Sequence, residues 1–430
     1  MIAFIAVLKE VLVNQLATVL KDNTVDCRAG SLSEMEQTLQ KMLQEVGQMA
    51  LSGWLEKQEE KYPVAVKDCE CGGEAAYIRQ REAVSITLQG KVGYRRAYYL
   101  CTCGRGQYPL DKRLGIAPGQ MSDGVKTVAA LLGVQEAYAT SSTTLAQLLP
   151  LELSPNSIRA ACHEVGDKVV REEAILLSAC QDLHKQTATQ RQHIPAERLY
   201  MSLDGFQAPF VADGWHELKA GVFWSVNANG QVYGQHYFVD TVPAADFANL
   251  VWAKAWQRGA DLAKQLVIIA DGSVWIWNMV KRLFPNAIHI NDWFHATSYL
   301  AKIATDAFGE GTPAATAWFT QHKSLLYDGH LAELMHACRT IRPLAPTASD
   351  AARRYFANNR TRLRYPKYRA LGLQIGSGVM ESACKQIGLL RLKLAGARWR
   401  EQGVRKLAKA RAAFLCDKSN FTPFALPLVA

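Results

Sequence analysis

Three acidic residues stand where a metal-dependent chemistry can be built. Apolar residues run into Asp204 and again into Asp271, each followed by glycine, as where a buried strand presents a carboxylate at its C-terminal edge. A third acid, Glu381, follows a Gly-Ser-Gly run. Hard divalent cations prefer carboxylate oxygens, and two such ions can activate a nucleophile and stabilise the leaving oxygen of a phosphate ester. The pattern predicts a site for two Mg²⁺ or Mn²⁺ ions and the cutting and joining of DNA strands.

Four cysteines form a second candidate metal site. They come as two Cys-x-Cys pairs, Cys69 with Cys71 and Cys101 with Cys103, separated by a hairpin-like segment that turns near Gly90. Four thiolates satisfy a tetrahedral Zn²⁺ and leave no open position, so the zinc expected here is structural. Each pair is one residue shorter than the usual Cys-x-x-Cys knuckle, and four unliganded thiols remain the alternative.

Length, composition and charge limit the kinds of protein that could carry these sites. The 430 residues suggest about three domains at roughly 150 residues each. A hydrophobic share of 49% allows large cores, and the net charge of +10 favours a polyanionic partner. No stretch is apolar for long enough to span a membrane, and the ten cysteines do not suggest a disulfide scaffold. We expect a cytoplasmic, nucleoid-associated bacterial protein with no membrane partner.

Residues 120–166 are typical of a helix-turn-helix. Residues 141–144 are expected to cap a helix through Leu149, and Ser154 to cap a second helix over 155–165 with proline at its first position. Such a helix can lie in the major groove of double-stranded DNA, with Asn156, Ser157 and Arg159 facing base edges. Two merely structural helices are the alternative. From Glu173 to Ala196 the polar composition predicts a helix end and a linker.

A mixed sheet is predicted next. Its expected strands and helices are, in order, strands 200–203, 215–225 and 231–239, helix 243–258, strand 266–270, helix 274–284 and strand 287–290. Hairpins imply antiparallel pairing and helical crossovers imply parallel pairing. This order is the one that a ribonuclease H-like nuclease core requires. Asp204 is expected to close the first strand and Asp271 the fourth, so the two acids meet at one edge if those strands are neighbours.

Helical and basic segments follow the predicted sheet. Residues 297–372 are expected to be an all-helical insertion whose arginine-rich end lines a DNA channel or is a solvated charged face. Trp318 within it is a candidate for stacking on an unpaired base or for core packing. Glu381 is expected in the first turn of the next helix. Basic residues close to it are candidate phosphate contacts, namely Lys385, Arg391, Lys393, Arg398 and Arg400.

From about Cys69 to Leu415 these motifs resemble bacterial insertion-sequence transposases of the Kra type (ISKra), which belong with the Mutator-like DDE transposases. The segment Gly-Ser-Gly-Val-Met-Glu-Ser around Glu381 is the most specific part of the resemblance. The resemblance implies Asp204, Asp271 and Glu381 as a catalytic metal-binding triad. It also implies that Asp292 and His295 form the Asp-x-x-His motif of that group. A competing assignment makes Asp292 the second triad acid and Asp271 an auxiliary.

The activity implied by the resemblance is DNA transposition. The protein would bind the terminal inverted repeats of its element, hydrolyse a phosphodiester bond, and join the freed 3′-hydroxyl to target DNA. Synapsis of two ends implies a homo-oligomer, a dimer or larger. The alternatives are a DNA-binding protein that has lost catalysis and a nuclease of the same fold that never joins strands.

The expected architecture is therefore a multidomain α/β protein. A helical N-terminus, a zinc-ribbon-like segment and a helix-turn-helix precede a ribonuclease H-like mixed-sheet catalytic core that an all-helical insertion interrupts. The expected parts are a helical region 1–65, the zinc-ribbon-like segment 66–118, the helix-turn-helix region 119–185, the first part of the core 196–296, the insertion 297–372, the second part of the core 373–415 and a tail 416–430.

Overall fold

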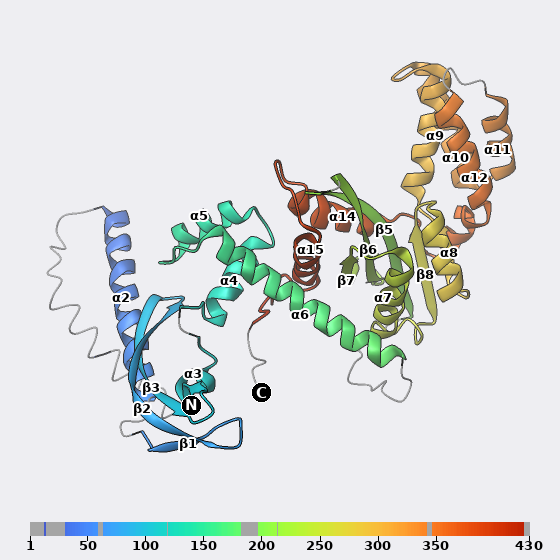
Figure 1. The fold of residues 1–430 in the computed structure, drawn as a ribbon. Coiled ribbons are helices and arrows are strands. Elements are labelled where there is room, and N and C mark those ends of the chain that lie inside the picture. The colour runs from blue at the N-terminus through green and yellow to red at the C-terminus, as the bar shows by residue number, and fades with distance from the viewer. Residues whose placement is uncertain are drawn as a thin grey trace. The chain divides into compact units, whose positions relative to one another are not determined.

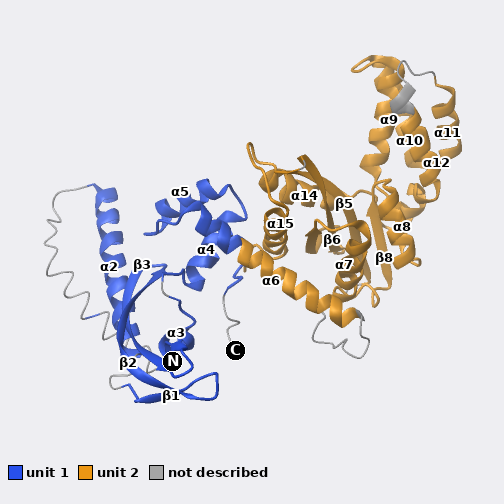
Figure 2. Ribbon diagram, in the orientation of Figure 1, with its two compact units in different colours: residues 1–162, 421–430 blue, residues 163–420 orange. Residues whose placement is uncertain are grey.

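The computed structural model describes residues 13, 31–58, 63–117, 119–181, 197–212, 214–341 and 346–424. The chain divides into two compact units, one of residues 1–162 with 421–430 and one of residues 163–420 (Figure 2). The seven parts predicted from the sequence divide the chain more finely than these two units. Most of the helix predicted before residue 31, and the linker predicted after residue 181, lie outside the described residues.

The first unit is built on a four-stranded antiparallel sheet against one helix (Figure 1). The alternating pattern of β3 places Val92 and Tyr94 on its buried face, where they pack with Leu55 of the helix. The helix begins after Ser31, whose N–H donates to the Glu34 carboxylate as in a capping box. The elements are α2 Leu32–Gln58, β1 Val66–Asp68, β2 Glu74–Thr87, β3 Gly90–Cys101 and β4 Gly106–Gln107.

Helices follow this sheet along the chain. Two of their predicted boundaries are wrong. The helix expected to begin at Ser141 begins at Tyr138, and Ser141 is buried within it. The helix that Ser154 caps does not stop at Val165 but continues to Gln181, because Leu176 and later residues still supply an apolar stripe that packs in the second unit. The elements are α3 Pro109–Leu114, α4 Asp123–Gly133, α5 Tyr138–Leu148 and α6 Pro155–Gln181.

The second unit contains a five-stranded mixed sheet in the order β7-β6-β5-β8-β9 (Figure 1). β5, β6 and β7 pair antiparallel, while β5, β8 and β9 pair parallel. Apolar residues of α7 and α8 pack with the strands in one large core. The elements are β5 Arg198–Phe210, β6 Gly214–Val226, β7 Val232–Asp240, α7 Ala244–Gln257, β8 Gln265–Ala270, α8 Val274–Leu283 and β9 Ile288–Asn291. The prediction of a multidomain α/β chain with a mixed sheet is confirmed.

The first strand of this sheet is longer than predicted. Asp204 does not close β5, which continues to Phe210. Pairing with β8 ends at Leu203, but pairing with β6 continues through Phe210. Asp204 therefore stands where β5 loses one of its two neighbours, which opens the sheet on that side.

Helices follow β9, as predicted. They are α9 Trp293–Phe308, α10 Pro313–Asp328, α11 Leu331–Thr340, α12 Pro346–Asn359, the 3₁₀ turn η3 Arg360–Arg362 and α13 Tyr365–Ala370. Figure 1 shows α9–α12 as a bundle beside the β8 end of the sheet. Glu381 lies in the first turn of α14 Gly378–Cys384, as predicted. The π-helix η4 Lys385–Leu392 and α15 Glu401–Cys416 end this unit. None of the helices in the described ranges combines the length and apolarity that crossing a membrane requires.

Candidate functional site

Three aspartates occupy one row at the ends of neighbouring parallel strands. Leu203 of β5 lies opposite Ala270 of β8, which in turn lies opposite Asn291 of β9. Adjacent strands are about 4.8 Å apart, so the residues that come next are also neighbours. They are Asp204, Asp271 and Asp292.

Asp204 is the acid most perturbed by its surroundings. Burial raises the pKa of its carboxyl above the ordinary value, and the charge of Asp271 adds to the rise. The N–H of Gly205 (2.7 Å) and the thiol of Cys384 (3.6 Å) donate to its oxygens and oppose that shift. A cation bound between two such carboxylates would remove their repulsion.

Asp271 keeps capacity for further ligands. One of its carboxylate oxygens accepts from the N–H of Ser273 (2.9 Å) and the other from the hydroxyl of the same residue (2.7 Å). An ionised carboxylate has about four lone-pair positions, so about two remain. The side chain is partly exposed.

Both carboxylate oxygens of Asp292 accept hydrogen bonds from the protein. The residue is completely buried and caps α9 by accepting from the N–H of His295, and it also accepts from the N–H of Ser377 just before α14. The ring Nδ1 of His295 lies 3.0 Å from the same carboxylate. Burial alone would raise the pKa of Asp292, but these hydrogen bonds hold it below the ordinary value. This carboxylate ties β9, α9 and the start of α14 together.

His295 faces the aspartate row. Its bond to Asp292 raises the pKa of its ring above the ordinary value against the effect of burial, and the charges of Asp271 and Asp204 add to the rise. With Nδ1 directed to Asp292, the other ring nitrogen is left to hold or release a proton. The Asp-x-x-His pair therefore forms one hydrogen-bonded unit, as its three-residue spacing at a helix start allows.

Glu381 lies on a different element, α14. α14 packs on β5 and β6, and Cys384, one turn after Glu381, contacts Asp204. The charges of both acids raise the pKa of the Cys384 thiol, after the larger effect of burial. Glu381 itself is exposed. Among the described residues, the triad acids do not form a group with all ligand atoms within 4.8 Å of one another.

Two side chains at this site were missed from the sequence. Cys384 carried no signal beyond its i+3 spacing from Glu381. Asn291 is completely buried just before Asp292, and it donates to the Tyr355 hydroxyl (3.1 Å) and accepts from Arg362 (2.9 Å). Through Asn291 the helical insertion is fixed to the end of β9. A polar residue at the end of an apolar strand was the available signal.

The predicted DNA-contacting side chains lie in both units. In the first turns of α6, Asn156 and Arg159 are exposed and Ser157 is half-buried. In the second unit, Lys385, Arg398 and Arg400 are exposed and Lys393 is half-buried. Arg391 differs, because it is buried beside the ring of Trp399.

Two arginines at the basic end of the insertion make structural contacts. Arg362 is buried over the ring of Trp277, and Arg353 donates to the carbonyl oxygens that end α11. The other basic residues of this end are exposed, namely Arg354, Arg360, Arg364, Lys367 and Arg369. Trp318 stacks on His322 with ring centroids 3.9 Å apart and is half-buried.

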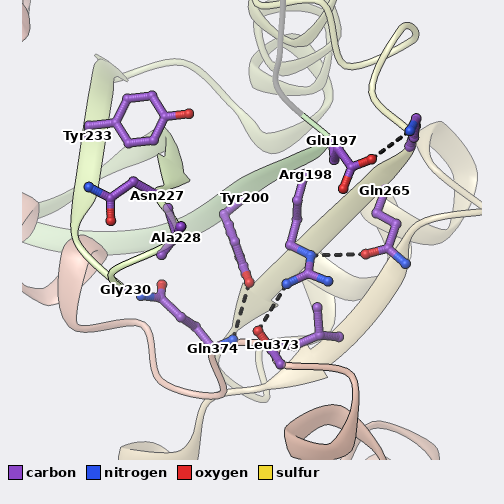
Figure 3. A pocket seen from close by; sticks show the side chains of 13 residues that line it. Glu197, Arg198, Tyr200, Asn227, Ala228, Gly230, Tyr233, Gln265, Leu373 and Gln374 are labelled. Atoms are coloured by element: carbon purple, nitrogen blue, oxygen red, sulfur yellow. Dashed lines mark hydrogen bonds and ion pairs between the residues drawn. The ribbon is translucent and has the colours of Figure 1, made fainter.

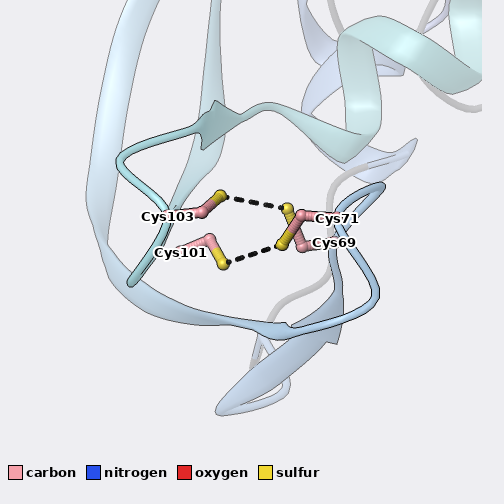
Figure 4. A group of neighbouring side chains, drawn as sticks. All are labelled: Cys69, Cys71, Cys101 and Cys103. Carbon is pink, nitrogen blue, oxygen red and sulfur yellow. Dashed lines mark hydrogen bonds between the residues drawn. The ribbon is translucent and has the colours of Figure 1, made fainter.

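The four cysteines converge, although both pairs are short (Figure 4). The two loops repeat one geometry: Gly72 and Gly104, each directly after a pair, adopt φ of 84°. The sulfurs of Cys69 and Cys103 are 3.8 Å apart and those of Cys71 and Cys101 are 3.7 Å apart. Tetrahedral zinc with bonds of about 2.3 Å places its sulfurs about 3.8 Å apart. The cluster fits a zinc ion.

One thiol of the cluster is prepared for metal binding. The N–H of Cys103 donates to the sulfur of Cys101 and, against burial, lowers the pKa of that thiol to about 6. Against the N–H of Arg105, the neighbouring thiols raise the pKa of the Cys103 thiol to about 11. A thiolate is the form that binds the metal. All four ligands come from the protein, so an ion here would be structural, as predicted.

Replacing Cys101 by serine should remove this metal. We expect one zinc per chain in the purified protein and none in Cys101→Ser, with the midpoint of thermal unfolding of the first unit lowered by roughly 10 °C or more. Metal content by mass spectrometry and calorimetry are the measurements. Cys180→Ser, outside the cluster, is the matched control and should keep its zinc. Equal zinc in both variants would contradict the assignment.

The largest described pocket is at the other end of the sheet. It has a volume of about 980 Å³ and lies where β5 and β8 begin (Figure 3). Its Arg198 guanidinium is already bonded to Gln265 and to the carbonyl oxygens of Leu371 and Gly372. Tyr200 accepts from the N–H of Gln374 (3.3 Å). These bonds join the sheet to the segment before α14, and none of the triad acids lines the pocket.

Comparison with known proteins assigns the chain to one protein family. None of the curated proteins matches the chain. A sequence model of one family matches residues 28–308, which include the four cysteines, the aspartate row and His295. Since that match covers more than half of the 430 residues, the chain belongs to the uncharacterised protein family UPF0236.

Proposed function

We propose that the protein is a DDE transposase of the Kra type, within the Mutator-like group. It would bind the terminal inverted repeats of an insertion sequence, cleave a DNA strand by metal-dependent hydrolysis and join the 3′-hydroxyl to target DNA. The observation that carries the proposal is the row of Asp204 and Asp271 on adjacent parallel strands, with the helix of Glu381 packed on β5. The strand order β7-β6-β5-β8-β9 is also the one expected of a ribonuclease H-like core.

Asp204 and Asp271 of the row would supply ligands for a pair of divalent cations. Asp204 is held partly dry beside the charge of Asp271, and Asp271 has unused lone pairs. Together with Glu381 they supply only oxygen ligands, as Mg²⁺ and Mn²⁺ prefer. When bound, such ions lower the pKa of a water and stabilise the leaving oxygen of the phosphodiester.

The protein's other side chains position this site. Asp292 orients His295 and fixes the Ser377 end of the loop that leads to Glu381. His295 is half exposed, and the charges of Asp204 and Asp271 act on its ring. It can hold or pass on a proton of the attacking water or hydroxyl. No side chain is needed as a covalent nucleophile.

Separate surfaces would hold the DNA. The exposed start of α6, with Asn156 and Arg159, suits a major groove, and the exposed Arg398 and Arg400 suit phosphates. A synaptic complex of two ends would use a dimer or larger homo-oligomer.

The product of the reaction tests this function. The full chain with Mg²⁺ is incubated with a plasmid that carries the DNA flanking its gene, together with a supercoiled target plasmid. Strand joining followed by sequencing of the junctions should give insertions with duplicated target sites. Breaks without joining would make the protein a nuclease of this fold, and DNA binding without breaks would make it a binding protein.

Asp271 and Asp292 are the two candidates for the second triad acid. The free energies of unfolding of their variants distinguish their roles. Asp271→Asn should leave the free energy of unfolding of the metal-free protein unchanged or higher, because it removes a charge that repels Asp204. Asp292→Asn should lower it by about 1–3 kcal/mol, because an amide cannot accept all the hydrogen bonds that this buried carboxylate accepts. Urea denaturation without divalent metal is the measurement.

Cleavage assays complete the comparison. Asp271→Asn should lose cleavage although its free energy of unfolding is unchanged or higher. Asp292→Asn should be less stable but should lose less cleavage than a triad variant does. The reverse pattern, with a stable inactive Asp292→Asn and an unstable active Asp271→Asn, would exchange the two assignments.

A further inference from the structure

An exposed tryptophan at the end of the β5–β6 hairpin has no role in the proposed chemistry. Trp215 is 61% exposed, the highest value among the ten tryptophans. It is the second residue of β6, opposite Pro209 and on the same pair of strands that carries Asp204. A large exposed aromatic side chain on a regular strand is a candidate for contact with a ligand.

Backbone hydrogen bonds hold the β5 side of the hairpin next to Trp399. The N–H of Val211 donates to the carbonyl oxygen of Trp399 (2.8 Å), and the N–H of Trp399 donates to that of Pro209 (3.0 Å). The rings of Phe210 and His216 stack with centroids 4.6 Å apart. Trp215 is therefore exposed beside a hydrogen-bonded segment of β5.

The same contacts bring positive charge to the tryptophan. The Nζ atom of Lys393 lies 5.8 Å from the ring centroid of Trp215, within the range of a cation–π interaction. Arg398 and Arg400, on either side of Trp399, are exposed. An aromatic face beside cations suits an unpaired nucleotide, because the base stacks on the ring and the phosphates meet the cations.

The strand places the tryptophan away from the acids. Pro209 is five residues after Asp204 on β5, which corresponds to about 17 Å at about 3.4 Å per residue. Side chains alternate between the two faces of a sheet, so Trp215, which pairs with Pro209, lies on the face opposite Asp204. A base on Trp215 would therefore be separate from the reacting phosphate.

We propose that Trp215 is a stacking site for an unpaired base of the DNA. This inference rests on the proposed function and adds a substrate requirement to it. The DNA would be unpaired where it meets Trp215, with its backbone along Lys393 and the arginines beside Trp399.

Binding to single-stranded and duplex DNA tests the proposal. The full chain, without divalent metal, is titrated against a labelled 20-nucleotide oligothymidylate and against a 20-base-pair duplex, with fluorescence anisotropy as readout. Trp215→Ala should weaken binding of the oligothymidylate by about 5- to 150-fold and of the duplex by less than about threefold. Trp215→Phe, which keeps an aromatic face, should stay within about threefold of the wild type on both.

The position of the base is tested separately. A single 2-aminopurine is moved along an unpaired strand whose cleavage point by the wild type with Mg²⁺ is mapped on the same substrate. Quenching should peak at one position relative to that point and be lost in Trp215→Ala. Trp252→Ala, which removes the next most exposed tryptophan, on α7, is the matched control and should change neither binding nor quenching.

The outcomes separate the two proposals. Unchanged oligothymidylate binding in Trp215→Ala, or equal losses on single-stranded and duplex DNA, would overturn the stacking site and leave the transposase proposal in place. A wild-type protein that binds neither DNA would overturn the transposase proposal as well.

Discussion

Replacing Asp204 by asparagine is expected to lower DNA cleavage by about a thousandfold or more while the fold is retained. The substitution keeps the size of the side chain and its acceptor for the Gly205 N–H, but removes the negative charge that holds cations. Metal stabilisation of a reacting phosphate contributes several kcal/mol, and each 1.36 kcal/mol is a factor of ten in rate. Losing a ligand shared by two ions removes most of that stabilisation.

Asp271→Asn and Glu381→Gln should fall by similar factors, because the three acids act as one unit and such losses are not additive. A double variant should be no worse than the single ones. The assay follows nicking of a supercoiled plasmid that carries the DNA flanking the gene, with Mg²⁺ or Mn²⁺ present, and binding of the same DNA by gel shift. Binding should survive in all three variants.

The matched control is Asp246→Asn, which removes an exposed acid in the first turn of α7, away from the row. It should cleave at the wild-type rate. Retained cleavage in any one of the three variants would remove that residue from the triad, and retained cleavage in all three would remove the proposed mechanism.

Local patterns predicted the elements of this site well. The apolar runs before Asp204 and Asp271 form β5 and β8, and the glycine-rich run before Glu381 begins α14. Strand order was also within reach, because hairpins and helical crossovers allow few arrangements. The structure adds the register, in which all three aspartates of the row fall at one level.

Partners that are distant in sequence could not be predicted in the same way. β5 continues past Asp204 only because β6 continues beside it, and no property of residues 205–210 alone indicated this. Glu173 was predicted to begin a polar segment made of a helix end and a linker. It lies within α6 and is buried, because lysines from α7 and α15 reach it. A charged residue in isolation suggests solvent, and only the fold reveals its counter-ions.

Those counter-ions lead to the largest stability effect that we expect. The Lys409 side chain is 1% exposed, and its Nζ atom contacts Glu173 and donates to Asp240 (2.8 Å) and to the carbonyl oxygen of Val239 (3.0 Å). Replacing Lys409 by methionine keeps the volume but removes a charge shared by two buried carboxylates. Removing one partner of a buried ion pair costs about 3–5 kcal/mol when the other charge is left uncompensated. Asp240 keeps its pair with Arg405 and Glu173 keeps its pair with Lys254, so Lys409→Met should lose about 3 kcal/mol, the lower end of that range. The free energy of unfolding at pH 7 is measured by urea denaturation.

The pH dependence identifies the cause of this loss. Burial opposes ionisation of Asp240, but Arg405 and Lys409 hold its pKa below the ordinary value. A lowered pKa stabilises the fold above the unfolded value of about 3.9, and this contribution is lost as pH falls through the folded value. The difference between wild type and Lys409→Met should therefore be full at pH 7 and shrink below about pH 4. Lys406→Met, whose ion pair with Asp167 is partly exposed, is the matched control and should lose less than about 1 kcal/mol. Equal losses in the two variants, or a difference that does not change with pH, would mean that lost packing and not the uncompensated carboxylates sets the cost.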